Sequence, residues 1–318
     1  MHKIVVLDGL VLNPGDLSWA PLQKLGPVTV YDRTPANLIR ERIGDADIIL
    51  TNKTPISREM IESCPNLRFI GALATGYNVI DTAAAKEHGV AVTNVPAYST
   101  HAVAQFTMAL LLEICHHIGA HSDEVQDGKW VRSPDFCYWS YPQTELWGKT
   151  FGIIGMGQIG QAAGKLADAF GMKVLYYSRT PKELPFPAQY RTLPELLGEA
   201  DILSLHCPLT AENTGLIGKE NLAKMKDGAI LINTARGPLV DEAAVAEALR
   251  SGKLSAFAAD VVQTEPMAAD SPLLGAPNCI LTPHIAWASH AARGRLMDIA
   301  IGNVFAFCDG KRENRVEG

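Results

Sequence analysis

The feature that most constrains how this chain can fold is a glycine-rich turn near the middle of the sequence. Gly155, Gly157 and Gly160 have the spacing G-x-G-x-x-G, directly after an apolar run at 151–154 and before a helical pattern at 158–170. The glycines permit a tight turn and a close approach of phosphate, and the free N–H groups of a helix N-terminus attract anions. In this strand–turn–helix context the motif predicts a Rossmann-like dinucleotide site, with these three glycines at the pyrophosphate.

The residues after the next predicted strand bear on which dinucleotide is bound. That strand, at 173–177, is followed by Ser178 and Arg179, whereas an NAD site usually has Asp or Glu here to bind the adenosine ribose. Without a carboxylate there is no repulsion toward a 2′-phosphate, and Arg179 can pair with one. The sequence therefore fits NAD(H) or NADP(H), and the alternative role for Arg179 is to stack on adenine with either cofactor.

Short apolar runs alternate with helical segments along most of the chain. This alternation is typical of βαβ units, which form parallel sheets. Two series of strands are expected, at 4–7, 28–31, 48–50, 69–73 and 90–93, and at 151–154, 173–177, 201–205, 229–232, 255–259 and 279–281. The predicted fold class is α/β, with two doubly wound parallel-sheet domains of the Rossmann type.

The end of the chain indicates how the two domains are connected. Only about 34 residues follow His284, too few for a core of their own, and a helix predicted at 289–307 must pack on the first strand series. The dinucleotide-binding domain, residues 100–287, is therefore expected to be inserted in a substrate domain formed by residues 1–99 and 288–318. This layout predicts a ligand cleft between the domains.

Composition and charge narrow the class of protein. A chain of 318 residues is too long for one ordinary core and suits two domains. The formal net charge of −6 argues against nucleic acid as a partner, which needs a basic surface, and no apolar run reaches the length of a membrane span. The apolar run at 4–7 is too short for the core of a signal peptide, so a cytoplasmic location is expected.

The cysteines and histidines do not indicate a metal site. The six cysteines are scattered without a C-x-x-C pair, and the nine histidines lack the spacing of zinc ligands. We therefore expect reduced thiols and no bound metal.

One segment, 123–149, belongs to neither strand series and is rich in aromatic residues. It contains Trp130, Trp139 and Trp147, three of the five tryptophans. We favour an arm that buries these side chains against a second subunit, which predicts a homodimer. The alternative is an ordinary loop folded over its own core.

Three further polar residues each follow a predicted strand of the second series. Arg236 follows the strand at 229–232, Glu265 the strand at 255–259, and His284 the strand at 279–281. Because the carboxyl ends of parallel strands line the ligand crevice of an open α/β sheet, we expect these three side chains to converge.

These residue types suit the reduction of a 2-keto acid. Hydride transfer to a ketone carbon leaves negative charge on its oxygen, and a protonated His284 can transfer a proton there. Glu265 can orient the imidazole and favour its cationic form. Arg236 can bind the substrate carboxylate through its planar fork and polarise the adjacent carbonyl. In the first domain, Thr75 and Gly76 lie in a loop of small residues after a strand, where successive N–H groups can hold the same carboxylate.

The glycine loop and the three later stretches resemble the motifs of the D-isomer-specific 2-hydroxyacid dehydrogenase family. The resemblance covers essentially the whole chain, and the Arg, Glu and His of the family correspond to Arg236, Glu265 and His284. It also implies substrate contacts from Thr75 and Gly76. Contacts with the cofactor are implied for a wider set of residues, namely Thr107, Gln158, Ile159, Cys207, Pro208, Thr234, Ala235, Arg236, Asp260 and His284.

The resemblance also narrows the substrate. Glu265 stands where formate dehydrogenases of the family have Gln, which argues against formate. The run 284–287 is similar to the branch that reduces hydroxypyruvate, and Trp287 would shorten the pocket and offer its N–H to a hydroxymethyl group. We therefore expect reduction of hydroxypyruvate or glyoxylate, as in glycerate dehydrogenases. The alternatives are a D-lactate-type or bulkier 2-keto acid reductase, with Trp287 packed at the hinge, and a non-catalytic dinucleotide-sensing module.

Overall fold

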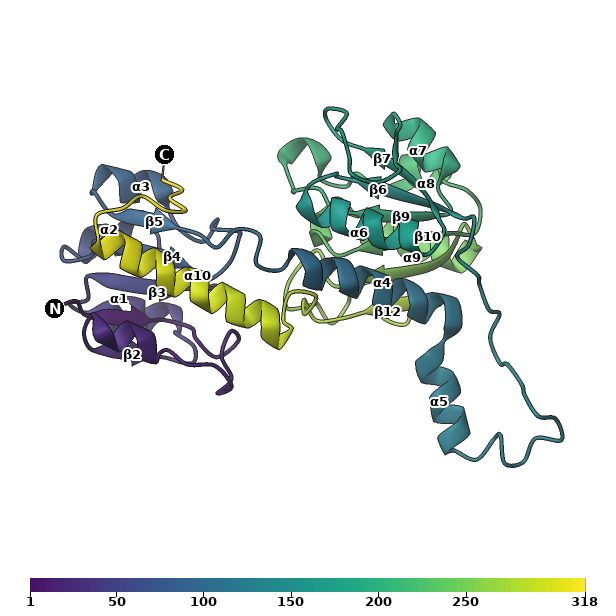
Figure 1. The fold of residues 1–318 in the computed structure, drawn as a ribbon, viewed down its shortest axis with the longest axis horizontal. Coiled ribbons are helices and arrows are strands. Elements are labelled where there is room, and N and C mark those ends of the chain that lie inside the picture. The colour runs from purple at the N-terminus through teal and green to yellow at the C-terminus, as the bar shows by residue number, and fades with distance from the viewer. Residues whose placement is uncertain (318) are drawn as a thin grey trace. The chain divides into compact units, whose positions relative to one another are not determined.

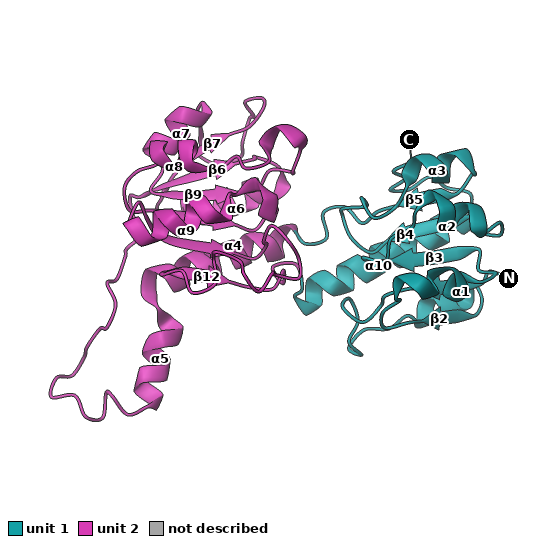
Figure 2. Ribbon diagram, turned by 180° about the vertical axis from the view of Figure 1, so that it is seen from behind, with its two compact units in different colours: residues 1–99, 288–318 teal, residues 100–287 magenta. Residues whose placement is uncertain are grey.

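The computed structural model describes residues 1–317 and separates the chain into two compact units (Figures 1 and 2). Unit 1 consists of Met1–Ser99 and Ala288–Gly318, and unit 2 of Thr100–Trp287. Gly318, the last residue of the predicted substrate domain, lies outside the described residues.

Unit 1 contains a five-stranded parallel sheet in the order β2-β1-β3-β4-β5. Its strands are β1 (Ile4–Val6), β2 (Val28–Val30), β3 (Ile48–Thr51), β4 (Phe69–Ala72) and β5 (Ala91–Thr93). All except the edge strand β2 are buried along their whole length, as expected for a parallel sheet covered on both faces.

Helices cover both faces of this sheet. One face packs against α1 (Ile39–Ile43), α2 (Arg58–Ser63) and α3 (Thr82–Glu87). The opposite face is covered by α10 (His290–Cys308), whose Phe307 ring lies 5.0 Å from the ring of Phe69 on β4. The C-terminal helix therefore completes the core that the first strand series begins.

Unit 2 contains a seven-stranded parallel sheet in the order β12-β11-β10-β9-β6-β7-β8. Its strands are β6 (Thr150–Ile154), β7 (Lys173–Tyr177), β8 (Gln189–Tyr190), β9 (Ile202–Leu205), β10 (Ala229–Asn233), β11 (Leu254–Ala259) and β12 (Cys279–Leu281). The strand order reverses between β6 and β9, the switch point at which open α/β sheets bind ligands. Both sheets are parallel and doubly wound, which confirms the predicted fold class.

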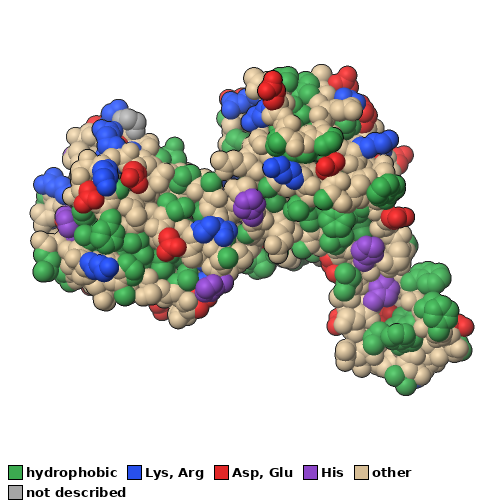
Figure 3. Space-filling view, viewed as in Figure 1, with side chains coloured by type: hydrophobic (Ala, Val, Ile, Leu, Met, Phe, Trp, Pro, Cys, Tyr) green, Lys and Arg blue, Asp and Glu red, His purple; other side chains and the backbone are tan. Residues whose placement is uncertain are grey.

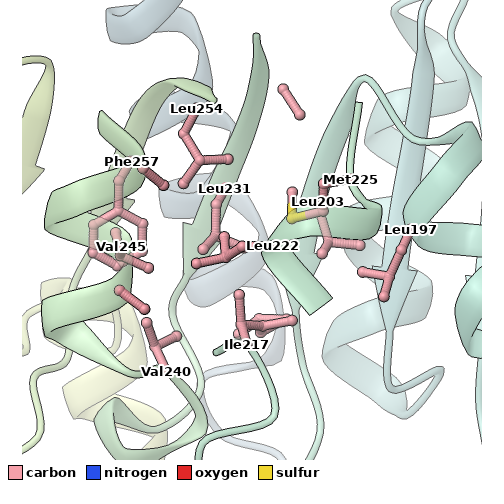
Figure 4. Packing of buried hydrophobic residues seen from close by; sticks show 14 of the residues in the cluster. Leu197, Leu203, Ile217, Leu222, Met225, Leu231, Val240, Val245, Leu254 and Phe257 are labelled. Atoms are coloured by element: carbon pink, nitrogen blue, oxygen red, sulfur yellow. The ribbon is translucent and has the colours of Figure 1, made fainter. Parts of the chain in front are cut away.

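Two hydrophobic clusters fill the two faces of the unit 2 sheet. On one face α4 (Thr100–His116) packs beside α6 (Gln158–Ala169). The other face carries α7 (Leu193–Glu199), α8 (Lys219–Lys224) and α9 (Glu242–Ser251). Figure 4 shows the second cluster, in which Leu203, Leu231 and Phe257 of the sheet meet Leu222 and Val245 of the helices. A core on both faces holds the strand ends in fixed register.

A helix that the sequence analysis did not predict, α5 (Ile118–Gln126), follows α4 after a left-handed residue at His117. With the segment behind it, α5 projects from the rest of unit 2 (Figure 1) and buries none of its own residues. Hydrophobic side chains gather on this projecting part (Figure 3), and within the segment after α5 Phe136 is 89% and Trp139 70% exposed. The aromatic residues of 123–149 thus do not form a core of their own.

Other departures from the expected elements are small. The short helix α2 and the two-residue strand β8 were not predicted, and residues 36–43 form a 3-10 turn followed by α1. Short 3-10 helices lie at Ala20–Lys24, Ala36–Leu38, Ala211–Asn213 and Gly237–Leu239.

Among the described residues, no single helix has the length and apolar character to cross a membrane. Only α4 and α5 taken as a pair reach that length and composition, and the two helices are bent by 57° at their junction.

Candidate active site

The glycine loop lies between β6 and α6, at the switch point of the unit 2 sheet. Gly155 has φ +99°, a backbone conformation that L side chains rarely adopt. A Cβ at this position would lie 2.5 Å from the backbone nitrogen of Cys207, just beyond the end of β9. The loop is therefore pressed against the neighbouring strand end, and only glycine fits at its first position.

The start of α6 provides an anion site that fits a dinucleotide. Gly157 is the N-cap residue and has no side chain to cap the first N–H groups of the helix. A Cβ on Gly157 would meet no described atom within 4 Å, so the space in front of these N–H groups is open. Uncapped donors, the helix dipole and open space are what a pyrophosphate needs, so these residues fit NAD(H) or NADP(H).

The strand end next to the glycine loop carries no carboxylate. Ser178 follows β7, and its hydroxyl donates a hydrogen bond to the carbonyl oxygen of Thr180 at 2.6 Å. Arg179 beside it is exposed. Neither residue is acidic, and a guanidinium such as that of Arg179 can pair with a phosphate.

Cys207 and Pro208 follow β9, and the backbone of Cys207 lies against Gly155. The neighbouring His206 has its Nε2 2.9 Å from the hydroxyl of Ser204, and desolvation of its imidazole lowers its pKa to about 4. Burial raises the pKa of the Cys207 thiol. Both side chains are therefore neutral at physiological pH, and the loop next to Gly155 adds no charge to the phosphate site.

The three residues predicted to carry the chemistry follow three adjacent strands. Arg236 comes after β10, Glu265 after β11 and His284 after β12, and β11 lies between the other two. The register aligns the strand ends, because Asn233 pairs with Ala259 and Ala259 with Leu281. All three loops consequently leave the sheet at the same edge.

His284 and Glu265 form a direct pair. Nδ1 of His284 lies 2.6 Å from Oε2 of Glu265, and the two side chains are 33% and 37% exposed. A carboxylate can only accept, so the imidazole donates through Nδ1 and keeps Nε2 for another partner. The guanidinium of Arg236 is exposed and donates from Nη1 to the carbonyl oxygen of Ala235 at 2.7 Å.

The loop that carries His284 has an unusual backbone that Asp260 holds in place. His284 has φ +56°, a left-handed conformation that costs an L residue about 1 kcal/mol or more. Asp260, only 1% exposed, accepts hydrogen bonds from the backbone N–H groups of Ile285 and Ala286, each at 2.8 Å. The hydroxyl of Thr282 donates to the same carboxylate at 2.7 Å.

This geometry gives Asp260 a role besides the one expected for it. The sequence analysis assigned it to the cofactor, and in the structure its buried carboxylate accepts three hydrogen bonds from the loop 282–286. Asp260 therefore contributes to the site by fixing the backbone on both sides of His284. Sequence reasoning found the residue and not its partners, because they lie more than twenty positions along the chain.

Asn233 plays the same part for Arg236 and was missed by the sequence analysis. It is 1% exposed at the end of β10, and its Nδ2 donates to the carbonyl oxygen of Arg236 at 2.8 Å. Its Oδ1 accepts from the N–H of Ala235 at 3.0 Å. A buried amide at the last position of a strand was the signal that could have identified it.

The side chain of Trp287 is arranged differently from the expectation. Its indole N–H was expected to reach a hydroxymethyl group of the substrate, but Nε1 donates to the carbonyl oxygen of His284 at 2.9 Å. That donor is therefore engaged within the loop. Through this bond Trp287 helps to hold the backbone of His284, the proposed proton donor, in place.

Other predicted contact residues are buried or belong to unit 1. Thr107 on α4 is fully buried, and its hydroxyl lies 3.0 Å from that of Thr234. Thr75 lies in unit 1 after β4, in a loop with Gly76, and its hydroxyl donates to the carbonyl oxygen of Val95 at 2.8 Å. The structure thus fixes this loop within its own unit.

Comparisons with known proteins identify the family of the chain. Residues 108–286 match the family described as D-isomer specific 2-hydroxyacid dehydrogenase, NAD binding domain. The chain is 56% identical to a hydroxypyruvate reductase of Blautia hydrogenotrophica over 319 residues, which cover 99% of each chain. It is 41% identical to a glycerate dehydrogenase of Methylorubrum extorquens over 286 residues, or 89% of each chain.

A solved structure extends the likeness to the fold. The crystal structure of an NADPH-dependent glyoxylate/hydroxypyruvate reductase from Sinorhizobium meliloti has a TM-score of 0.85 to this chain at 28% identity. The match covers 99% of this chain and 98% of that one. The chain therefore belongs to the D-isomer-specific 2-hydroxyacid dehydrogenase family, as its motifs predicted, and is an NAD(P)-dependent oxidoreductase of small hydroxy or keto acids.

Proposed function

We propose that this enzyme reduces hydroxypyruvate or glyoxylate to the corresponding 2-hydroxy acid, as a glycerate dehydrogenase does. The observation that carries the proposal is the pair of His284 and Glu265, 2.6 Å apart at the edge of the sheet that also bears the glycine loop. The relatives named above support this substrate class over a D-lactate-type reductase or a non-catalytic sensor, since a hydroxypyruvate reductase matches over 99% of the chain.

Each of the three side chains has its own role in the proposed reduction. The bound nicotinamide supplies the hydride. Nε2 of a protonated His284 donates the proton that neutralises the new alkoxide oxygen, while Glu265 keeps the ring oriented through Nδ1. Arg236 binds the carboxylate of the 2-keto acid and polarises the neighbouring carbonyl. The left-handed backbone at His284, held by Asp260, fixes the direction of the imidazole.

The cofactor contacts follow from the loops around the switch point. The backbone of Gly155, Gly157, Gln158, Ile159 and Gly160 is proposed to hold the pyrophosphate in front of α6. We propose that the adenosine ribose and a 2′-phosphate bind beside Ser178 and Arg179, which would favour NADP(H). We also propose cofactor contacts from the loops at Cys207–Pro208 and Thr234–Arg236, and from Thr107, Asp260 and His284.

Substrate contacts are proposed for Thr75 and Gly76 as well as for Arg236 and Trp287. The loop with Thr75 and Gly76 would hold the substrate carboxylate through its N–H groups. Trp287 would act as a wall of the pocket through its ring, since its N–H is already bonded to the carbonyl of His284. A large indole next to the proton donor leaves room for a short substituent on C2 and disfavours a bulky one.

A homodimer formed through the aromatic arm is part of the proposal. The arm is the segment 123–149, which begins within α5, and it exposes Trp130, Phe136, Trp139 and Trp147. Large aromatic side chains gathered on one surface are typical of protein interfaces. We also place the protein in the cytoplasm, because its six cysteines are all unpaired, as in a reducing compartment.

Initial rates over a panel of 2-keto acids test this function. With NADPH and with NADH, kcat/KM should be highest for hydroxypyruvate and glyoxylate, lower for pyruvate and very low for phenylpyruvate. A preference for phenylpyruvate would contradict the substrate and leave the reaction class standing. Dinucleotide binding without turnover of any 2-keto acid would contradict the enzymatic function itself.

A further inference from the structure

The loop that carries Glu265 needs support from elsewhere in unit 2. It runs from the end of β11 through residue 272 without a helix or a strand. Within the loop, Glu265 makes only a long bond, 3.4 Å from its Oε1 to the N–H of Val262. A cavity of about 230 Å³ opens beside the loop, lined by Glu242, Gln263, Thr264 and Ser271 among others. Val262 and Met267 of the loop pack against the hydrophobic core, and the cavity beside them leaves part of the loop to be held by polar contacts.

Glu242 bridges this loop from the side of the cavity. It is the first residue of α9 and is only 7% exposed. Its Oε1 accepts a hydrogen bond from the backbone N–H of Gln263 at 2.7 Å, and its Oε2 accepts from the hydroxyl of Ser271 at 3.0 Å. The two bonds reach the loop on either side of Glu265. The N-terminus of α9 stabilises the negative charge that makes both bonds strong.

The same stretch of loop abuts the residue after Arg236. A Cβ on Gly237 would lie 1.9 Å from the carbonyl oxygen of Val262, so only glycine permits this approach. Val262 and Gln263 belong to the loop of Glu265, and they also contact the loop of Arg236 at Gly237. A group that holds the N–H of Gln263 in place therefore also sets the distance between the loop of Arg236 and the loop of Glu265.

We propose that Glu242 is a positioning residue for the proton donor, because its buried carboxylate fixes the loop 262–271 and thereby holds Glu265 against His284. The inference rests on the proposed function of the pair formed by Glu265 and His284. Glu242 acts through Glu265 and need not touch the substrate. It would do for the loop of Glu265 what Asn233 does for Arg236 and Asp260 for His284.

Three variants separate positioning from simple stability. Glu242→Ala removes both acceptors. Glu242→Gln can keep both bonds, because its Oε1 still accepts from Gln263 while its amide donates to the Ser271 hydroxyl. Glu195→Ala is the matched control, since Glu195 also accepts two hydrogen bonds at a helix start, from Thr192, and lies on α7. Each change is made in the wild-type enzyme and in the Glu265→Gln background, and kcat, KM and the dinucleotide Kd are measured.

A positioning role predicts a specific pattern. Glu242→Ala should lower kcat for hydroxypyruvate by at least about tenfold with little change in dinucleotide Kd, and Glu242→Gln should restore most of it. In the Glu265→Gln background, Glu242→Ala should lower kcat by less than about twofold, because the two residues act on one step. Glu195→Ala should leave kcat unchanged.

Other outcomes overturn the proposal. Equal losses in both backgrounds, or a wild-type kcat in Glu242→Ala, would show that Glu242 does not act through Glu265. If Glu242→Ala does not fold, Ser271→Ala is used instead, because it removes one of the two bonds. Ser271→Ala should lower kcat in the wild-type enzyme and have less effect in the Glu265→Gln background. An unchanged kcat in Ser271→Ala would also overturn the proposal. A normal kcat in Glu265→Gln alone would instead refute the proposed pair, and this inference with it.

Discussion

Glu265 and His284 leave the sheet from different strands, and Oε2 of the first lies 2.6 Å from Nδ1 of the second. The bond fixes which ring nitrogen faces the carboxylate, so Nε2 is left for the substrate oxygen. The left-handed backbone of His284, which Asp260 holds through Ile285 and Ala286, sets the direction of the ring. The charge of the pair and its geometry can therefore be tested separately.

Glu265→Gln tests the charge of the pair, since it removes the negative charge and keeps the shape. The imidazolium then loses the anion that stabilises it, so keto-acid reduction should lose activity at neutral pH and its pH profile should change. The measurement is kcat/KM between about pH 5 and 9, a range that spans histidine titration. Glu220→Gln, at an exposed carboxylate paired with Lys224, should leave the profile unchanged. Superposable profiles for wild type and Glu265→Gln would remove Glu265 from the mechanism.

Ser178→Asp tests the assignment of the ribose site. The new carboxylate would accept hydrogen bonds from the ribose of NADH and repel the 2′-phosphate of NADPH. We expect the efficiency with NADPH relative to NADH to fall by at least about tenfold, equivalent to about 1.4 kcal/mol. Ser251→Asp adds the same charge at the far end of α9 and should not change the ratio. Equal effects on both cofactors would place Ser178 away from the ribose.

His206 should make the stability of unit 2 depend on pH. Its pKa is about 4 in the folded chain against an ordinary value of 6.5, because burial disfavours the charged imidazole. The unfolded chain therefore takes up the proton first, and this contribution to stability, complete above about pH 6.5, is lost as pH falls toward 4. From the shift in pKa, the loss approaches about 3 kcal/mol in the acid limit.

Urea unfolding followed by tryptophan fluorescence measures this effect, since four of the five tryptophans lie in unit 2. Between about pH 6 and 5, His206→Gln should lose less unfolding free energy than wild type, by about 1 kcal/mol per pH unit. His88→Gln, at an exposed histidine of unit 1, is the control. Parallel pH dependences in wild type and His206→Gln would show that His206 titrates normally.

The sequence was sufficient to predict the elements that have a strong local pattern of apolar residues. Buried parallel strands appear in the sequence as apolar runs, so the predicted ends of β6, β7 and β12 agree with the structure to within one residue. The strand-end positions of Arg236, Glu265 and His284 follow from the same runs. Helix α5 was missed because it buries no residue and so lacks a clear apolar face.

What the sequence did not predict depends on contacts between distant segments. Asp260 bonds to residues more than twenty positions later, and the N–H of Trp287 turns back to the carbonyl of His284 because of the left-handed backbone there. Neither arrangement leaves a periodic signal in the chain. Single residues could be assigned to the site from the sequence, whereas their hydrogen-bond partners required the structure.

The central claim is that His284 donates the proton in the reduction of hydroxypyruvate, and His284→Gln tests it most directly. Steady-state turnover of hydroxypyruvate and dinucleotide binding are measured on the same preparation, with His290→Gln, an exposed histidine of unit 1, as the control. We predict that His284→Gln binds the dinucleotide normally and that its turnover falls by about 10²–10⁴-fold, the usual contribution of general acid catalysis. Turnover within a few-fold of wild type in His284→Gln would contradict the account.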